Sequence, residues 1–333
     1  MSSLGELVEL LRRSLQARAT WIRDDSDAAL RLFAGFYEGY PDLVVDLYGQ
    51  TLVLFDYTES PDLGGEILSI AQDRLLESLP WVDCVIWKRR AAQDQNLRQG
   101  VVTFGEKPTE KISEHGIRYA LDLLMNQDAG FYLDTRLLRK WLLENAAGWS
   151  VLNTFAFTGS LGIAALAGNA ARVVQVDLNR QFLALARQSG MLNRFDIGKM
   201  KLRAADFFSE VARLKREDEL FDCVIVDPPF FSSTAKGRVD LINESVRVIN
   251  KVRPLVKDGG VLISINNALF LKGADYYQSL EELCKDGYLS IEELLPVPQD
   301  VTGFPESILN SPPADPAPFN HSTKIAVLRV KRK

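Results

Sequence analysis

A regular alternation of strand-like and helix-like segments begins after Trp149 and constrains the fold of this 333-residue chain more than any other feature. Short β-rich runs separate stretches whose apolar residues recur at helical spacing. This repetition is typical of a mainly parallel, doubly wound α/β sheet with helices on both faces. Two further strand-like runs, 289–295 and 324–330, flank a proline-rich stretch, 296–321, that is too long for a simple connector. The other expected strands are residues 150–154, 172–176, 201–204, 223–226 and 261–265, and the expected helices are residues 161–168, 180–193, 207–215 and 239–256.

The first 125 residues have a different pattern. Residues 4–20 place leucines at helical spacing and predict an amphipathic helix. Between residues 29 and 57, short β-rich runs broken by glycine and proline indicate a small antiparallel meander. We therefore expect a small α+β domain over residues 1–125 and a larger α/β domain over residues 126–333. The small domain is also expected to hold a helix at 63–79 and strands at 84–87 and 118–123.

Composition excludes several classes of protein. The chain is 47% apolar and 25% charged and has no low-complexity tracts, which argues against wholesale disorder. No apolar run approaches the ~18 residues of a membrane span, and the N-terminus does not read as a secretory signal. Cys84, Cys223 and Cys284 are too scattered for a disulfide framework or a zinc site, and His115 and His321 have no neighbouring ligands. We expect a cytoplasmic protein without a metal.

The net charge of -5 argues against a protein that coats nucleic acid non-specifically, because such binding depends on neutralising phosphates. Local basic clusters could still contact RNA. The alternative interpretation of each cluster is a solvated surface or tail. The clusters are Lys88-Arg89-Arg90, Arg329 with Lys331-Arg332-Lys333, and Arg12-Arg13 with Arg18.

The turn after the first strand of the larger domain, Asn153–Gly159, is the first candidate site. In a doubly wound sheet, ligands bind beyond the carboxyl ends of the strands. Gly159 permits a sharp strand-to-helix turn and lets a ligand approach backbone N–H groups. The full dinucleotide motif is missing, which favours a nucleoside with a smaller polar group over a pyrophosphate. The alternative is that the glycine only packs a helix onto its strand.

Acidic residues follow the next two expected strands. Asp177 ends the second strand, where a carboxylate could accept hydrogen bonds from both hydroxyls of a ribose. Asp206 follows the third strand and could accept from an exocyclic amine, with Phe207 covering a purine face. For each acid the alternative role is that of a helix cap.

The most specific signal is the run from Phe221 to Phe231, where a buried apolar strand leads directly into Asp227-Pro228-Pro229-Phe230. Two prolines stiffen the turn and leave its carbonyls and the Asp227 carboxylate as acceptors without competing donors. The aromatic residue that follows could stack on a planar acceptor group. A glycine turn, two acids and this motif at the ends of four successive strands form a combined signal.

These residues resemble those of class I S-adenosylmethionine-dependent methyltransferases. The segments 130–136 and 152–159 are similar to the large-subunit (23S) ribosomal RNA methyltransferase family, and Gly39–Gly49 resembles that family's middle domain. The resemblance implies a Rossmann-like, seven-stranded methyltransferase domain that follows a small α+β domain. It also implies an RNA substrate.

The resemblance further implies S-adenosyl-L-methionine as the cofactor. Asp177 would bind its ribose, Asp206 and Phe207 its adenine, and the turn from Asn153 its methionine half. Asn266 and Asn267 could read a base edge, or could instead satisfy loop backbone at a polar strand end. The expected cofactor-binding residues are Tyr132, Asp134, Arg136, Asn153, Phe155, Phe157, Thr158, Gly159, Asp177, Leu178, Asp206, Phe207 and Asp227. The expected catalytic residues are Asp227, Pro228, Pro229, Phe230, Asn266 and Asn267.

Two branches of the family differ in the base that they methylate. Cytosine C5 is a poor nucleophile, so that branch needs a cysteine thiolate to add at C6 first. Guanine N7 carries an in-plane lone pair and can attack directly. The segment 262–267 has no cysteine, and its Ser-x-Asn-Asn form resembles the guanine-N7 branch. We therefore expect direct, in-line methyl transfer to guanine N7 of ribosomal RNA, without a cysteine nucleophile.

Three other functions stay open at this point. The Asp-Pro-Pro-Phe motif also suits a protein amide or amine or a small molecule, and the acidic charge balance favours that class. A cytosine-C5 RNA methyltransferase is the second alternative. The third is an inactive homologue that only binds RNA, against which the retained Asp177, Asp206 and Asp227 argue. The sequence does not fix the oligomeric state, and no membrane partner is expected.

Overall fold

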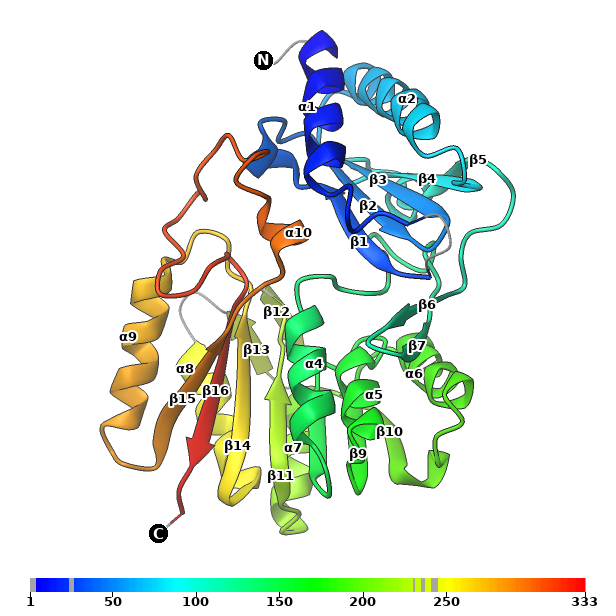
Figure 1. Ribbon diagram of the computed structural model, residues 1–333. Coiled ribbons are helices and arrows are strands. Elements are labelled where there is room, and N and C mark those ends of the chain that lie inside the picture. The colour runs from blue at the N-terminus through cyan, green and yellow to red at the C-terminus, as the bar shows by residue number, and fades with distance from the viewer. Residues whose placement is uncertain (1–3, 24–26, 230, 235–236, 241–244, 333) are drawn as a thin grey trace. The chain divides into compact units, whose positions relative to one another are not determined.

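The chain forms two compact units (Figure 1). Unit 1 contains residues 1–133 and 298–311, and unit 2 contains residues 134–297 and 312–333. The division falls after residue 133 instead of residue 125, and unit 1 includes a late segment that the sequence pattern did not assign to it. The computed structural model describes residues 4–23, 27–229, 231–234, 237–240 and 245–332.

Unit 2 is built on a seven-stranded sheet with the order β10-β9-β8-β11-β14-β16-β15. The first five strands in this order run parallel, and β16 is antiparallel to both of its neighbours. This arrangement confirms the expected Rossmann-like methyltransferase sheet. The strands are β8 (Ser150–Thr154), β9 (Arg172–Asp177), β10 (Met200–Ala204), β11 (Phe221–Val226), β14 (Val256–Asn266), β15 (Leu289–Leu295) and β16 (Lys324–Val330).

Helices cover this sheet. Buried residues of α7, α8 and α9 join the strands in one apolar core, whereas α4, α5 and α6 pack against one another. The ribbon in Figure 1 shows these helices beside the sheet. None of the helices in the described part of the chain is long and apolar enough to cross a membrane. The helices are α4 (Arg136–Asn145), α5 (Ser160–Ala167), α6 (Arg180–Leu192), α7 (Phe207–Arg216), α8 (Ser245–Val252) and α9 (Gly273–Cys284).

The helix expected at 239–256 is much shorter than the apolar pattern predicted. Its start is occupied by a strand of the hairpin β12 (Phe231–Thr234) and β13 (Gly237–Asp240), and its end by β14. Residues 241–244 lie outside the described residues. The spacing of the apolar residues therefore predicted a helix that runs into the hairpin, because this spacing does not distinguish the two structures.

The register of the parallel strands sets the position of the candidate site. Val226 of β11 lies beside Thr154 of β8 and Ser264 of β14. Thr154 also lies beside Val176 of β9. The residues that follow these strands therefore meet at one edge of the sheet, which we call the carboxyl edge.

Unit 1 contains a five-stranded sheet with the order β1-β2-β3-β4-β5. The pairs β1–β2 and β2–β3 are antiparallel, as the meander prediction required, but β4 joins β3 in parallel after a helical crossover. A two-stranded hairpin, β6–β7, forms separately. The elements are α1 (Leu4–Ala17), β1 (Ala29–Phe33), β2 (Leu43–Tyr48), β3 (Thr51–Asp56), α2 (Pro61–Ser78), β4 (Cys84–Arg89), α3 (Gln95–Gln99), β5 (Val101–Phe104), β6 (Lys111–Glu114) and β7 (Ile117–Ala120).

A buried ionic network holds the late segment, with its short helix α10 (Gln299–Thr302), in unit 1. Arg18 and Glu38 are almost fully buried, and their Nη1 and Oε1 atoms lie 2.8 Å apart. Arg18 Nη2 also donates to the backbone carbonyl of Asp300 at 2.9 Å, and the Ser307 hydroxyl donates to Glu38. The proline-rich stretch therefore supplies partners for charges that would otherwise be buried alone.

Replacing Arg18 by Met should destabilise the protein strongly, because Glu38 would stay buried without its cation. Removing one partner of a buried pair costs about 3–5 kcal/mol. The matched control is Arg12→Met on α1, the helix that Arg18 directly follows: the Arg12 and Glu9 side chains are 63% and 62% exposed, so solvent screens this pair and its loss should change stability little. Urea denaturation followed by tryptophan fluorescence measures both. Equal losses in the two variants would contradict a stabilising role for the network.

Candidate active site

The turn after β8 has an unusual backbone. Phe155, Phe157 and Gly159 all have positive φ angles, of 54°, 51° and 79°. Aromatic residues rarely adopt this conformation, so surrounding interactions must hold it in place. One of them is a hydrogen bond from the Phe157 backbone N–H to Asp177 Oδ2 at 2.8 Å. A strained turn is thus fixed at the carboxyl edge by the neighbouring strand.

Gly159 itself is required by protein packing. A Cβ atom there would lie 2.5 Å from the Cβ of Ala186 and 2.7 Å from Nε2 of the buried Gln175. The structure thus favours the packing role that the sequence left open for this glycine. Asn153 Nδ2 donates to Gln175 Oε1 at 3.0 Å, but its buried Oδ1 has no hydrogen-bond partner among the described residues.

Asp177 is half-buried and fixes the turn. Its Oδ2 accepts from Phe157, and its Oδ1 accepts from the Asn179 backbone N–H at 2.8 Å. The side chain that caps α6 is Asn179, so Asp177 is not the helix cap. Burial raises the pKa of Asp177, and the backbone hydrogen bonds oppose that rise. The Leu178 backbone N–H is a third donor to this carboxylate, and the Leu178 side chain is 68% exposed.

Asp206 and Phe207 have clearer structural roles than expected. Asp206 caps α7 by accepting from the Ser209 backbone N–H at 3.0 Å. Phe207 is only 6% exposed and stacks on Phe155, with ring centroids 4.5 Å apart. The expectation that Phe207 covers a purine face is therefore not met by this buried ring. Phe155 is half-buried and is the more accessible ring of the pair.

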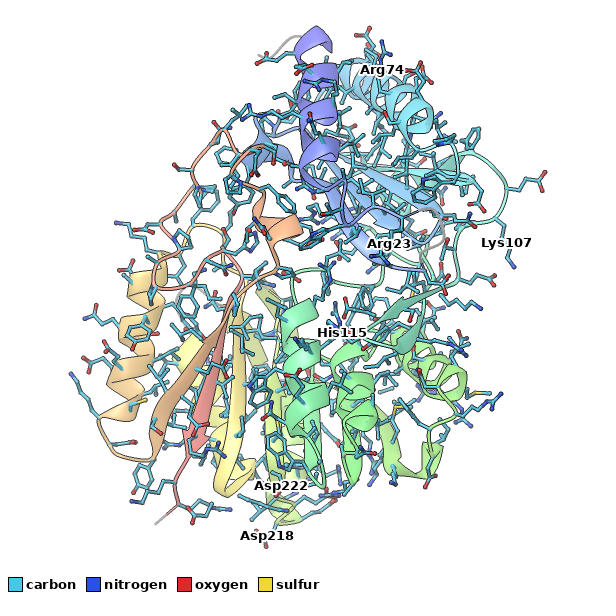
Figure 2. The ribbon with its side chains drawn as sticks, viewed as in Figure 1. Arg23, Arg74, Lys107, His115, Asp218 and Asp222 are labelled. Atoms are coloured by element: carbon cyan, nitrogen blue, oxygen red, sulfur yellow. The ribbon has the colours of Figure 1, made fainter. Side chains whose placement is uncertain are left out.

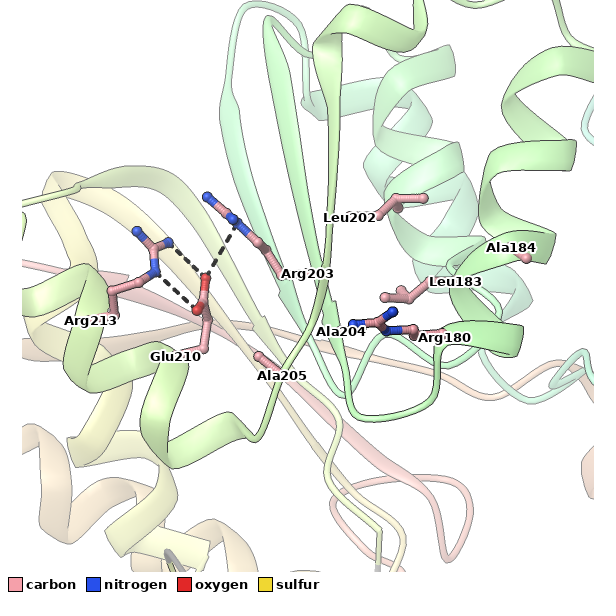
Figure 3. A pocket seen from close by; sticks show the side chains of 9 residues that line it. All are labelled: Arg180, Leu183, Ala184, Leu202, Arg203, Ala204, Ala205, Glu210 and Arg213. Atoms are coloured by element: carbon pink, nitrogen blue, oxygen red, sulfur yellow. Dashed lines mark hydrogen bonds and ion pairs between the residues drawn. The ribbon is translucent and has the colours of Figure 1, made fainter.

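A pocket of about 470 Å³ lies beside the edge strand β10, between α6 and α7 (Figure 3). Its most buried charge is Glu210, which receives two hydrogen bonds from Arg213 and lies 3.8 Å from Arg203. The pocket reaches Ala205, the residue before Asp206, but none of the expected site residues lines it. It therefore adjoins the candidate site without forming it.

Asp227 follows β11 at the centre of the carboxyl edge. Burial, and then the negative charge of Asp134, raise its pKa to about 7. Asp134 is held by a hydrogen bond from the Thr323 hydroxyl to its Oδ2 at 2.8 Å. Pro228 is buried and Pro229 is exposed. The structure thus brings two carboxylates of unit 2 near each other, at a place where a bound cation would be stabilised.

Two expected site residues are not assembled there by the described structure. Tyr132 belongs to unit 1, where its hydroxyl donates to Asp128 at 3.2 Å. Phe230 lies outside the described residues. Arg136, at the start of α4, is half-buried within unit 2, and Thr158 is buried in the turn.

The two asparagines at the end of β14 differ. Asn266 is fully buried, and its Oδ1 accepts from the Ala268 backbone N–H at 2.9 Å. It therefore serves the loop backbone, the role offered above as the alternative to reading a base. Asn267 is exposed and available.

Lys324 is a site residue that the sequence analysis missed. It pairs with Asn266 across β14 and β16 and is fully buried. Its Nζ donates to the carbonyls of Ala268 at 2.9 Å and Ser322 at 2.6 Å, and burial lowers its pKa to about 8. The available signal was a lysine at the start of a strand whose next four residues, 325–328, are apolar.

Most residues of the basic clusters are buried or form hydrogen bonds and ion pairs within the protein. Lys88 is fully buried, Arg89 pairs with Asp56, and Arg90 pairs with Asp128. Arg329 lies beside Val261 at the amino end of the parallel strands, because β16 is antiparallel. Within unit 2, Arg329 therefore lies away from the carboxyl edge. In the third cluster, Arg12, Arg13 and Arg18 contact Glu9, the Glu306 carbonyl and Glu38 respectively.

The histidines have ordinary environments. His115 lies in the exposed β6–β7 turn (Figure 2). His321 Nδ1 accepts from the Thr323 backbone N–H at 3.0 Å. Among the residues that the structure describes, no group of three or more potential ligands is placed to hold a metal ion.

Comparison with known proteins identifies the family. The family model for S-adenosylmethionine-dependent methyltransferases matches residues 98–301, more than half of the chain. The chain belongs to the S-adenosylmethionine-dependent methyltransferase family. A solved methyltransferase from Streptococcus mutans has a TM-score of 0.83 at 21% identity and covers 99% of this chain and 82% of its own. Another, in complex with SAH, has a TM-score of 0.85 at 22% identity and covers 99% and 82%. At these identities the two structures support the fold.

The similar curated proteins are ribosomal RNA methyltransferases. Ribosomal RNA large subunit methyltransferase I of Erwinia tasmaniensis is 31% identical over 266 residues, 78% of this chain and 65% of that protein. Its namesake from Escherichia coli O139:H28 is 29% identical over 280 residues, 78% and 67% respectively. This methyltransferase therefore spans about 65% of the length of the Erwinia relative. These names do not support the expected guanine-N7 branch.

The residues at the carboxyl edge fit the family's cofactor. S-adenosylmethionine supplies an electrophilic methyl group on a positively charged sulfonium when it is bound. Asp177 is a half-buried carboxylate at the end of β9 that can accept from ribose hydroxyls, and Asn153 Oδ1 is a buried acceptor without a partner among the described residues. Asp134 and Asp227 offer negative charge to a cation. The donor and acceptor set therefore suits this molecule.

Replacing Asp177 by Ala should weaken S-adenosylmethionine binding by at least tenfold. The variant loses charged acceptors worth about 1.5–3 kcal/mol each, and the strained turn loses its support. The matched control is Asp222→Ala, because Asp222 lies at the amino end of β11 and accepts from Ser150 and Lys257 (Figure 2). Titration calorimetry measures both affinities. Unchanged affinity in folded Asp177→Ala would exclude the ribose assignment.

The affinity of the methyltransferase for this cationic cofactor should rise as the pH rises through about 7. Asp227 has a raised pKa, so it carries its charge only above that pH, and the charge attracts a cation. Asp227→Asn should abolish the inflection. Asp134→Asn should move it to lower pH, because a like charge is removed. Calorimetry across the range tests this, and an inflection that persists in Asp227→Asn would assign it to another group.

The raised pKa of Asp227 also affects folding stability, but this effect weakens as the pH rises, whereas cofactor affinity should strengthen. The unfolded chain releases the Asp227 proton near its ordinary pKa, whereas the folded chain keeps it until about pH 7. The contribution of Asp227 to stability is therefore complete below the ordinary pKa and is lost as the pH rises towards 7. Because affinity should rise with pH and this contribution to stability should fall, a gain in binding at higher pH cannot be caused by a gain in stability.

Proposed function

We propose that this protein methylates a base of ribosomal RNA, with S-adenosylmethionine as the methyl donor. The observation that carries the proposal is the convergence of Asp177, Asp134 and Asp227 at the carboxyl edge of a methyltransferase sheet. The names of the similar proteins support ribosomal RNA as the substrate class. Such a substrate would place the protein in the cytoplasm.

The residues of unit 2 would act mainly by positioning. Asp177 and the strained turn would orient the ribose and methionine portions of the cofactor, and Asp206 would lie at its adenine end. Asp227 and Asn267 would hold the acceptor base beyond the ends of β11 and β14. Holding two reacting atoms in line at near-attack distance supplies much of the rate enhancement in such a transfer.

The cysteines support a direct transfer. Cys223 is fully buried in β11, and burial raises the pKa of its thiol. Cys84 is buried in unit 1, and Cys284 ends α9, away from the strand ends that carry Asp227 and Asn267. A cysteine nucleophile, which C5 chemistry needs, is therefore not offered at the carboxyl edge. Guanine N7, which attacks with its own lone pair, remains our proposal for the acceptor.

A protein amide, an amine or a small molecule is the second candidate substrate. The observation in its favour is that Lys88 is buried and that Arg89, Arg90 and Arg329 are ion-paired, so these four residues offer little free positive charge to phosphates. An inactive RNA-binding homologue is a weaker alternative, because the acidic groups of the cofactor site are retained.

Mass-spectrometric nucleoside analysis of ribosomal RNA, from cells with and without the gene, tests the proposal. Loss of 7-methylguanosine at one position, restored by the wild-type gene but not by Asp227→Ala, is the expected result. Loss of 5-methylcytidine instead would transfer the acceptor to cytosine. No change in any ribosomal RNA nucleoside would favour the protein or small-molecule substrate.

A variant with Cys84, Cys223 and Cys284 all replaced by Ala or Ser should keep its catalytic rate within a few-fold once its folding is verified. The physical reason is that no thiol is placed to add to a base. Asp227→Ala should be far slower, since a misplacement of ~1 Å can cost on the order of a hundredfold. Radiolabelled methyl transfer to ribosomal RNA measures both rates. A covalent adduct with 5-fluorocytosine-containing RNA that depends on one cysteine would contradict direct transfer.

A further inference from the structure

The turn that follows β14, residues 267–270, exposes an aromatic ring. Phe270 is 71% exposed and Leu269 is 43% exposed. The side chain of Phe270 therefore contributes little to the core of unit 2. These two adjacent side chains leave an apolar surface beside the candidate active site.

Two buried side chains, Asn266 and Lys324, hold the backbone of this turn in place. Ala268, at its centre, is fully buried, and both of its backbone groups are bonded to side chains. Its N–H donates to Asn266 Oδ1 at 2.9 Å, and its carbonyl accepts from the buried Nζ of Lys324, also at 2.9 Å. The ammonium group is fixed in turn by the carbonyl of Ser322 at 2.6 Å. A ring presented by an ordered backbone loses less conformational entropy on binding than one on a mobile loop.

The turn lies next to the methyl-acceptor position. In the paired strands, Val226 lies beside Ser264, so the chain reaches Asp227 and Asn266 at the same edge of the sheet. Asn267, the first residue of the turn, is exposed and offers an amide to a hydrogen-bonding partner. Lys272, just beyond the turn, is also exposed. An aromatic face, an amide and a cation thus occur within six consecutive residues at the reacting edge.

We propose that the 267–270 turn is a docking platform for an unpaired nucleobase of the substrate RNA, with the Phe270 ring stacking on the base. This inference rests on the proposed function. A nucleobase fits the platform because it offers a π face to Phe270 and polar edges to Asn267. The phosphate of the same nucleotide would be attracted by Lys272. Lys324 is a positioning residue, since it acts only through the backbone of the turn.

The test compares Phe270→Ala with Phe270→Trp. The probe is a short, unstructured ribo-oligonucleotide that carries 2-aminopurine, whose fluorescence falls when the base stacks. Phe270→Ala should bind it about 5- to 150-fold more weakly and lose the quenching, whereas Phe270→Trp should retain both. The matched control is Met191→Ala, an apolar residue 62% exposed near the C-terminal end of α6. It should bind like the wild type, and S-adenosylmethionine affinity should be unchanged in all three variants.

Lys324→Met provides a second measurement. It should increase hydrogen–deuterium exchange in residues 267–271 and weaken oligonucleotide binding, whereas Phe270→Ala should weaken binding without changing exchange. Rescue of both properties by Lys324→Arg would support positioning through the two carbonyls. Unchanged exchange in Lys324→Met would overturn the anchoring role.

The outcomes separate this inference from the proposed function. If the wild type methylates ribosomal RNA and Phe270→Ala binds and methylates as well, the platform is overturned and the function stands. If the wild type binds the oligonucleotide through Phe270 but alters no ribosomal nucleoside, the platform stands and the ribosomal RNA proposal fails. A wild type that does not bind the oligonucleotide also overturns the platform.

Discussion

The parallel pairing of β11 with β8 and β14 is the constraint on which the candidate site depends. It sets Thr154, Val226 and Ser264 side by side, so that the segments after three strands emerge together. Groups far apart in the chain, such as Asp177 and Asp227, thereby share one edge of the sheet. A shift of one residue in this register would turn every side chain of a strand to the other face.

Most polar groups at this edge stabilise the local structure in addition to their expected chemical role. Asp177 supports a turn in which two aromatic residues have positive φ angles. Asn266 and Lys324 hold the turn that carries Asn267. Substituting such residues changes the shape of the site together with its chemistry. The exposed Asn267 and Phe270 are therefore cleaner probes of substrate contact than the buried groups.

Several basic residues that are adjacent in sequence are paired or buried within the protein. The lysines and arginines that look like RNA-binding clusters in sequence, such as Lys88 and Arg90, are buried or paired within unit 1. The buried ion pair between Arg18 and Glu38 likewise holds the late segment, residues 298–311, in that unit.

The sequence by itself determined the sheet class, the seven strands of the main sheet of the larger domain and the motif at Asp227, because alternating periodicity and turn residues are local signals. Only the tertiary structure decided that 298–311 belongs to unit 1, that Phe207 is a core ring and that Lys324 is buried beneath a turn. Each of these depends on contacts between residues distant in the chain, which no local pattern encodes. Burial and partner choice, and with them the available chemistry of each side chain, are properties of the folded molecule.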